Sequence, residues 1–307
     1  MKDIALIFPG QGAQKVGMGK EFYDGSLHAR AIFDQADKIC SNGLKKVMFE
    51  GPEDQLTKTT FAQPAILTMS LAALAAFSAH PKYKTVNVQF TAGLSLGEYS
   101  ALTAAGSLKL VDALRLVMKR GAFMDEACAQ NIGTMAAILS FDKNKLVEIC
   151  QQTGAEIANF NSKEQIVITG HNDKINAAID AIKSAGGQKI IPLTVAGAFH
   201  SSLMQTAADK FKDSLKDIVI EVGAIKVVSN VTGLPQHNAM DIRENLYKQI
   251  TASVQWVNSI EFMIDQGITE FIEIGPGKVL KGLIRRINPN VIVHNIEKPT
   301  DLESISI

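Results

Sequence analysis

A serine in the sequence is placed where it could act as a nucleophile. Residues 93–97 read Gly-Leu-Ser-Leu-Gly, so Ser95 is the centre of a G-x-S-x-G pattern. The β-prone stretch 86–92 precedes this pattern, and the alanine-rich, helix-prone stretch 98–105 follows it. A tight turn between a strand and a helix exposes such a serine hydroxyl at the carboxyl end of the strand, beside the positive end of the helix. An ordinary glycine-bounded turn is the alternative, and the strand–helix context favours a nucleophile.

A serine nucleophile also needs a general base, which is most often histidine. The chain has six histidines, and His200 is the one in a loop expected between a strand and a helix. Its surroundings, residues 196–201, are mostly small and lie where two predicted parts of the chain join, so a cleft is expected there. No acidic residue lies in a comparable loop to complete a triad, so a backbone or amide oxygen would orient the imidazole. A structural or surface histidine is the alternative.

A glycine-rich loop could supply the donors that stabilise an oxyanion. Residues 9–14 read Pro-Gly-Gln-Gly-Ala-Gln and follow the short apolar stretch 4–8, which is expected to be a strand. Glycines let the backbone bend and turn its N–H groups inward. The loop lacks the Lys-Ser/Thr of a P-loop and the spacing of a dinucleotide-binding motif. An oxyanion hole is the favoured function, with a plain strand-to-helix loop as the alternative.

The order of expected elements predicts an α/β fold in two parts. Residues 1–127 and 197–307 alternate strands with helices, which is typical of a parallel sheet covered by helices on both faces. Residues 128–196 follow the order β-α-β-β-α-β of a ferredoxin-like subdomain, which we expect to be inserted into the larger part. The expected strands are 4–8, 86–92, 134–141, 156–161, 165–169, 188–195, 226–229 and 270–274, and the expected helices are 21–40, 52–57, 65–79, 98–105, 111–127, 143–152, 173–184, 203–215, 242–249, one after 256, and 279–287.

Composition excludes several classes of protein. The 307 residues include 31 basic and 31 acidic side chains, a balance that indicates no nucleic-acid partner. Cys40, Cys128 and Cys150 are far apart, so we expect no disulfide, no metal site and a reducing cytosol. The longest apolar run, Ala65–Ala79, is too short for a membrane span and is expected to be a buried helix. The apolar stretch at the N-terminus is too short for a signal peptide, so we expect a cytoplasmic protein with no membrane partner.

Six short motifs, in their order and spacing, resemble those of a known enzyme family. They are Gly10-Gln11-Gly12-x-Gln14, Gly93-x-Ser95-Leu96-Gly97-Glu98-Tyr99-Ser100-Ala101, Arg120-Gly121, Phe199-His200-Ser201, Gln249 and Glu273-Ile274-Gly275-Pro276-Gly277. Together they resemble the malonyl-CoA:acyl carrier protein transacylases of type II fatty acid synthesis, over residues 4–287. The resemblance implies a large hydrolase-like domain and a small ferredoxin-like one, in agreement with the order of the expected elements.

The resemblance also implies a role for each matched residue. Ser95 would attack the thioester of malonyl-CoA and hold the malonyl group as an ester. His200 would take the serine proton and later activate the phosphopantetheine thiol of acyl carrier protein, with the backbone carbonyl of Gln249 orienting the imidazole. The backbone N–H groups of Gln11 and Leu96 would form the oxyanion hole. Malonyl-CoA and acyl carrier protein would be the partners, no cofactor would be needed, and we expect a monomer.

The carboxylate of the malonyl group would pair with Arg120. Such a role is chemically sensible, because a carboxylate is costly to bury unpaired and a guanidinium meets it with two parallel hydrogen bonds. On the residues alone, a solvated helix arginine is the alternative for Arg120. The segment 197–200, Gly-Ala-Phe-His, resembles the malonyl-type sequence of related polyketide acyltransferases. Since a bulky Phe199 would leave little room for an α-methyl group, it predicts malonyl over methylmalonyl.

One position departs from the family pattern, and one helix carries extra positive charge. The family commonly has histidine where this chain has Leu94; because His200 supplies the base, we expect activity to be kept. Lys278, Lys281, Arg285 and Arg286 are expected on one helix, either as a docking surface for an acidic carrier protein or as a solvated face. The alternative functions are a serine hydrolase or thioesterase, a trans-acting polyketide acyltransferase, and a catalytically silent module that binds a carrier protein.

Overall fold

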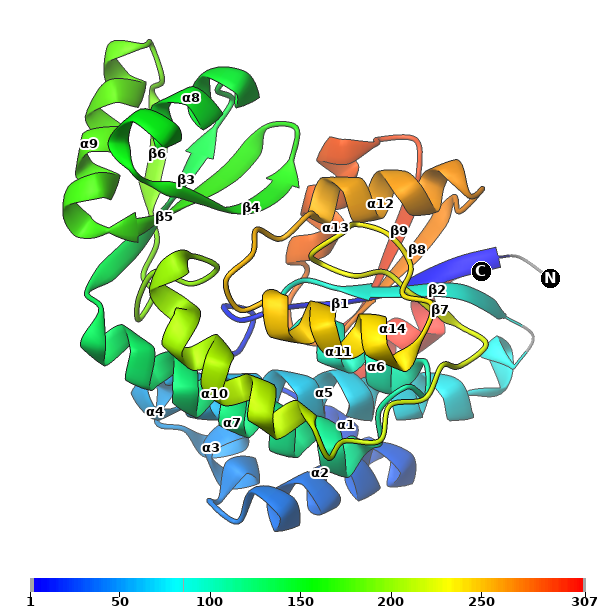
Figure 1. The fold of residues 1–307 in the computed structure, drawn as a ribbon. Helices are drawn as coiled ribbons and strands as arrows, with labels where there is room; N and C mark the ends of the chain where they lie inside the picture. Colours follow the sequence, from blue (N-terminus) through cyan, green and yellow to red (C-terminus); the bar gives the residue numbers. More distant parts are fainter. Residues whose placement is uncertain (1–2, 85, 306–307) are drawn as a thin grey trace.

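A five-stranded parallel sheet forms the centre of the larger part of the molecule (Figure 1). The computed structural model describes residues 3–84 and 86–305. The strands lie in the order β7-β2-β1-β8-β9 and pair in parallel throughout. Their bounds are β1 Asp3–Phe8, β2 Asn87–Gly93, β7 Lys226–Val227, β8 Glu270–Ile274 and β9 Ile292–Ile296. The expected parallel sheet is thus confirmed, and β9 is an edge strand that the sequence analysis missed.

Successive side chains of β1 point to opposite faces of the sheet, and an apolar layer packs against each face. Ile4, Leu6 and Phe8 pack into one apolar cluster, whereas Ala5 and Ile7 pack into another on the opposite face. The first cluster includes residues of α2, α5, α6, α7, α10 and α11, and the second includes residues of α12 and α13. The helix bounds are α1 Lys20–Gly25, α2 Leu27–Cys40, α3 Leu44–Glu50, α4 Glu53–Thr57, α5 Thr59–Ala79, α6 Gly97–Ala104, α7 Leu110–Gln130, α10 Gln205–Leu215, α11 Ala239–Lys248, α12 Trp256–Asp265, α13 Val279–Ile287 and α14 Pro299–Ser304, with 3₁₀ turns at Pro81–Tyr83 and Ser202–Met204.

Most residues of helix α5 are buried. It is long and apolar enough to span a membrane, but most of it is buried inside the protein, as a core helix is. The expected buried helix is confirmed, although its expected start at Ala65 is wrong. The helix begins at Thr59 and contains Pro64, and the carboxylate of Asp125 on α7 accepts a hydrogen bond from the N–H of Thr60 at 3.3 Å. That tertiary contact caps the first turn, so the helix extends ahead of the proline.

A single helix expected over residues 21–40 is instead two helices, α1 and α2. Ser26 lies between them in an extended conformation, and its hydroxyl accepts a hydrogen bond from the N–H of Ala29. This is the contact of a helix N-cap, which starts α2 in a new direction. The sequence analysis also missed α3 and α14.

A second, antiparallel sheet of four strands forms the smaller part. Its strands are β3 Gly133–Leu139, β4 Glu156–Ser162, β5 Gln165–His171 and β6 Lys189–Pro192, in the order β4-β5-β3-β6. Helices α8, Lys143–Thr153, and α9, Asn172–Ser184, pack against it through a separate apolar cluster. The expected β-α-β-β-α-β order is confirmed. All four strands fall inside residues 128–196, and the boundaries of that subdomain stay a prediction.

Candidate active site

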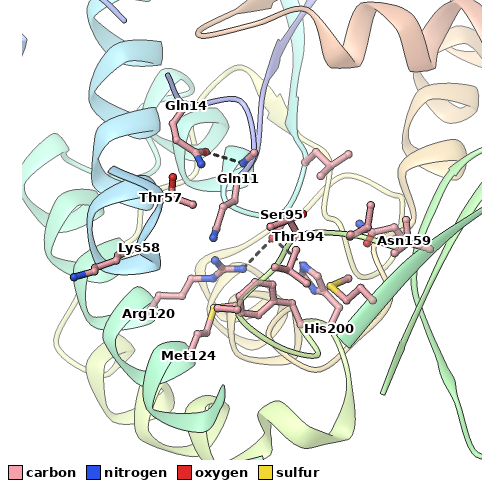
Figure 2. A pocket seen from close by; sticks show the side chains of 18 of the residues that line it. Gln11, Gln14, Thr57, Lys58, Ser95, Arg120, Met124, Asn159, Thr194 and His200 are labelled. Carbon is pink, nitrogen blue, oxygen red and sulfur yellow. Dashed lines mark hydrogen bonds between the residues drawn. The ribbon is translucent and has the colours of Figure 1, made fainter. Parts of the chain in front are cut away.

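The register of the central strands brings the glycine-rich loop beside the turn that carries Ser95. Phe8, the last residue of β1, lies opposite Gly93, the last residue of β2, and the carbonyl of Phe8 accepts a hydrogen bond from the N–H of Leu94. Because parallel strands end at the same edge of a sheet, the two segments leave it together. Ser95 and Gln11 therefore both line one cavity (Figure 2).

The backbone at Ser95 is held in a conformation that few non-glycine residues adopt. Its φ is +52°, in the left-handed region, as expected of a serine presented on a sharp turn between β2 and α6. A Cβ atom at Gly93 would lie 2.0 Å from the carbonyl of Gly97, so the turn can be this tight only with glycine there. The side-chain oxygen of Asn230 accepts a hydrogen bond from the N–H of Ser95 at 2.6 Å, and its NH₂ donates to the carbonyl of Gly93 at 2.6 Å. Asn230 thereby stabilises the strained turn.

His200 lies next to Ser95, although the two are 105 residues apart in sequence. The Nε2 atom of His200 is 2.8 Å from the hydroxyl oxygen of Ser95, and Nδ1 is 2.8 Å from the backbone carbonyl of Gln249. Since a carbonyl can only accept, Nδ1 carries the proton and Nε2 is free to accept one from the serine. His200 is buried and has φ +57°, so the alternative of a surface histidine is wrong.

The surroundings of His200 keep it uncharged near neutral pH. Burial, together with the positive charge of Arg120, lowers the pKa of His200 to about 4, and the hydrogen bond to Gln249 opposes that shift. A neutral imidazole is the form that can take a proton from a serine hydroxyl.

Arg120 reaches the same point from the buried face of α7. Its Nη2 donates a hydrogen bond to the hydroxyl of Ser95 at 3.1 Å (Figure 2). It donates a second one to the side-chain oxygen of Gln249 at 3.0 Å. Only about 1% of Arg120 is exposed, so the alternative of a solvated helix arginine is wrong. Its helical spacing from the buried Ala113, Val117 and Met124 was a sequence signal for this inward position.

Two backbone N–H groups are available beside Ser95. Leu96 immediately precedes α6, and Gln11 is held close because Gly10 packs against the turn, where a Cβ atom would lie 2.4 Å from the carbonyl of Leu94. Within residues 3–84 and 86–305, the N–H groups of Gln11 and Leu96 have no hydrogen-bond acceptor. Unpaired donors at the start of a helix and next to a nucleophile suit the stabilisation of an oxyanion.

The cavity has a volume of about 470 Å³ and lies between the two sheets. Met135, Asn159 and Val167 form its wall on the antiparallel sheet, and Phe199 lies on the segment that returns from that sheet. Ser95, Arg120 and His200 converge on its floor (Figure 2). Among the residues that the structure describes, no group of three or more His, Cys, Asp or Glu side chains could hold a metal ion.

Comparisons with known proteins identify the family. Residues 5–291 match the family described as the acyl transferase domain. The chain belongs to this family. It is 42% identical to the malonyl CoA-acyl carrier protein transacylase of Bacillus subtilis, over 99% of this chain and 96% of the relative.

Solved structures of this family are also close to the chain. The malonyl CoA-acyl carrier protein transacylase of Clostridium perfringens has a TM-score of 0.93 at 40% identity, with 99% of this chain and 96% of that one covered. A malonyl-transacylase solved in complex with a holo type II PKS acyl-carrier protein has a TM-score of 0.94 at 33% identity, with 99% and 98% covered. This acyl transferase domain thus carries the family fold along nearly its whole length.

Sequence reasoning missed the polar residues that support the site from behind. Asn230 follows β7 at the edge of the sheet where Ser95 also lies, a position that could have drawn attention to it. Glu98, in the first turn of α6, is fully buried, and burial raises its pKa to about 7 against the opposing effect of hydrogen bonds from Gln249, Asn230 and Gln236. The side chain of Gln249 also takes part, in addition to its backbone carbonyl.

Proposed function

We propose that this protein transfers the malonyl group of malonyl-CoA to the phosphopantetheine thiol of an acyl carrier protein. One observation carries the proposal: a guanidinium lies 3.1 Å from the hydroxyl of a serine that is paired with a neutral histidine, inside a cavity of about 470 Å³. A nucleophile next to a buried cation suits an acyl group that ends in a free carboxylate. The names of the relatives, which are malonyl transacylases acting on acyl carrier protein, support the same reaction.

The first half of the reaction would load the protein. His200 Nε2 takes the proton of Ser95 as the serine oxygen attacks the thioester carbonyl, whose oxygen becomes an anion facing the N–H groups of Gln11 and Leu96. The C–S bond then breaks, and the CoA thiolate leaves with the proton from His200. Arg120 holds the malonyl carboxylate throughout, and the product of this half is a malonyl ester of Ser95.

The second half would reverse these steps with a different thiol. The carrier protein's phosphopantetheine enters the cavity, and His200 takes the thiol proton as the sulfur attacks the ester carbonyl. The bond to Ser95 breaks, the serine oxygen recovers a proton from His200, and malonyl-carrier protein leaves. Throughout both halves the carbonyl of Gln249 fixes the tautomer of His200 in place of a triad acid. The reaction requires no cofactor, and we place it in the cytoplasm.

Four basic residues, Lys278 directly before α13 and three within this helix, are proposed to steer the carrier protein. Lys278, Arg285 and Arg286 are exposed, and Lys281 is half-buried. An acidic partner would be attracted to these charges, and such steering acts mainly on the rate of association. We expect that reversing Arg285 and Arg286 to Glu lowers kcat/KM for the carrier protein by about tenfold while leaving acyl-enzyme formation from malonyl-CoA within about twofold. Stopped-flow loading and steady-state transfer, measured on one sample, check this. An equal kcat/KM for the carrier protein in the wild type and in the charge-reversed variant would contradict the proposed docking surface.

Intact mass spectrometry tests the loading step directly. The protein is mixed with malonyl-CoA, and the Ser95→Ala variant is the matched control. The proposal predicts a malonyl adduct that maps to the peptide containing Ser95 and is missing from the variant. An adduct on another residue, or none in a folded sample, would contradict it.

A further inference from the structure

A buried carboxylate lies directly behind the nucleophile and is surrounded by hydrogen-bond donors. One oxygen of Glu98 accepts hydrogen bonds from the side-chain amide of Gln249 at 2.6 Å and from the backbone N–H of Asn230 at 3.2 Å. Its other oxygen accepts one from the side-chain amide of Gln236 at 3.1 Å. Glu98 is fully buried and does not line the cavity, so it does not touch the acyl group. An acceptor-only group is what three donors require.

The side chain of Gln249 connects this carboxylate to Arg120. Its NH₂ donates to Glu98 and to the backbone carbonyl of Ser95 at 3.0 Å, while its oxygen accepts from the guanidinium of Arg120 at 3.0 Å. Two acceptors on one side and a donor on the other leave a single orientation for the amide. Glu98 makes the shorter of the two bonds to the NH₂, so it contributes strongly to fixing the amide that in turn fixes the guanidinium.

We propose that Glu98 is a positioning residue that holds Arg120 in place through Gln249 and thereby sets the selectivity for acyl groups with a free carboxylate. This inference rests on the proposed function. The relay of Glu98, Gln249 and Arg120 also balances charge, because a buried guanidinium is costly without an anion nearby. When it is ionised, Glu98 supplies that anion from behind, so the front of the guanidinium is left for the carboxylate of the substrate.

A purely structural role for Glu98 is the competing explanation. The carboxylate also binds Asn230 and Gln236, so its loss could simply loosen the turn that carries Ser95. In that case every acyl group would be affected alike. In the positioning role, malonyl transfer suffers more than acetyl transfer, because only malonyl uses the guanidinium.

The experiment compares kcat and KM for malonyl-CoA and acetyl-CoA in four single variants, in the double variant Arg120→Ala/Glu98→Ala and in Glu98→Gln. Glu98→Ala removes the anchor, and Gln249→Met removes the relay while keeping the backbone carbonyl that binds His200. Arg120→Ala removes the end of the relay. Glu273→Ala is the matched control. Glu273 is also buried, and burial raises its pKa to about 7. Its carboxylate, however, accepts hydrogen bonds from the backbone N–H groups of Leu280 and Lys281 at the start of α13.

We expect Glu98→Ala and Gln249→Met each to raise the KM for malonyl-CoA and to lower the malonyl-to-acetyl ratio of kcat/KM by about tenfold. Glu273→Ala should leave that ratio unchanged. In the Arg120→Ala background, adding Glu98→Ala should no longer change the ratio, because its effect passes through the guanidinium. If Glu98→Ala does not fold, Gln249→Met carries the test together with Glu98→Gln, which keeps an acceptor oxygen for Gln249 but loses the negative charge; Glu98→Gln should lower the ratio by less than Gln249→Met does.

Two results would overturn the inference. One is an equal loss for malonyl-CoA and acetyl-CoA in Glu98→Ala and Gln249→Met. The other is a Glu98→Ala effect on the ratio that persists unchanged without Arg120. Either result leaves the proposed function intact provided that the wild-type protein forms its malonyl adduct. A wild-type protein that forms no adduct would refute the proposed function itself, so the two failures are distinguishable.

Discussion

The two sheets of the molecule contribute to the same cavity in different ways. The segments around the parallel sheet supply the groups that can move a proton or pair with a charge at its floor: Ser95, His200 and Arg120. The antiparallel sheet supplies Met135, Asn159 and Val167, none of which titrates near neutral pH. It also holds the returning segment in place, because the hydroxyl of Thr169 donates to the backbone carbonyl of Phe199 at 2.9 Å. The part with the parallel sheet thus supplies the reactive groups, and the part with the antiparallel sheet supplies a wall of the cavity.

The largest expected effect comes from removing His200, the proposed base. His200→Ala should lower kcat for malonyl transfer by about a thousandfold or more, because His200 is the one described side chain able to accept a proton that contacts the hydroxyl of Ser95. Met135→Ala, on the opposite wall, is the matched control and should change kcat by less than about threefold. Steady-state transfer assays on both variants check this prediction. A loss of kcat in Met135→Ala close to that in His200→Ala would contradict the assignment of the reactive groups to the parallel-sheet part alone.

Removal of the guanidinium should be next in size and selective. Arg120→Ala should lower kcat/KM for malonyl-CoA by about 100-fold, since the malonyl carboxylate is then buried unpaired, while kcat/KM for acetyl-CoA changes by less than about fivefold. Competition between the two thioesters in one reaction measures the ratio directly. Equal losses on both would remove Arg120 from the substrate role.

The lowered pKa of His200 also predicts how the activity depends on pH. Because the pKa of His200 is lowered to about 4, the base stays neutral as the pH falls through the range in which a free imidazole would be protonated. Between about pH 8 and pH 5.5, kcat/KM for acetyl-CoA should fall by less than about twofold, whereas a base with the ordinary pKa would give about a tenfold fall. Acetyl-CoA is the substrate of choice, because Glu98 has a pKa near 7 and is proposed to act through Arg120 on malonyl alone.

The sign of the stability effect follows from the same pKa. His200 has a lower pKa in the folded protein than in the unfolded one, so the unfolded state binds more protons as the pH falls from about 6.5 towards 4. The contribution of His200 to stability is therefore lost in that window, whereas Glu98 and Glu273, whose pKa values are raised to about 7, contribute stability as the pH falls below 7. Circular dichroism at each pH separates unfolding of the protein from protonation of His200. A tenfold fall in kcat/KM for acetyl-CoA in a sample that remains folded would contradict the low pKa of His200.

The smallest effect is expected where the two parts join. Phe199 lines the cavity next to His200, and we expect Phe199→Ala to raise the methylmalonyl-to-malonyl ratio of kcat/KM by about tenfold or less, as one methyl group in an apolar pocket allows. Mass spectrometry of the acyl-enzyme formed from an equimolar mixture gives the ratio. A wild-type protein that already loads both thioesters equally would contradict the predicted preference.

The predictable part of the structure is the part that local sequence determines. The turn at Ser95 is coded within a few residues by Gly93 and Gly97, and the alternation of strands and helices gave both sheets. His200 was a candidate from its loop alone. The role of Arg120 was inferred from the family resemblance. Its helical spacing from apolar residues of α7 already indicated that the side chain is buried.

The rest could not be predicted because it depends on contacts between distant segments. Helix α5 begins ahead of its proline because Asp125 caps it from another helix. Asn230 lies 135 residues from Ser95 along the chain and supports its backbone. Glu98 is part of one of the six motifs, but its proposed role depends on Gln249 and Arg120, which are distant in sequence and fold against it.

The central claim is transfer between thiols, and a single-turnover experiment tests it most directly. Purified malonyl-enzyme is split into two portions, one mixed with phosphopantetheinylated carrier protein and one with buffer, and intact mass is followed in both. The account predicts that the malonyl group moves from Ser95 to the carrier thiol much faster than it is lost to water. Loss at the same rate in both portions, with no malonyl-carrier protein formed, would contradict the account and identify a hydrolase.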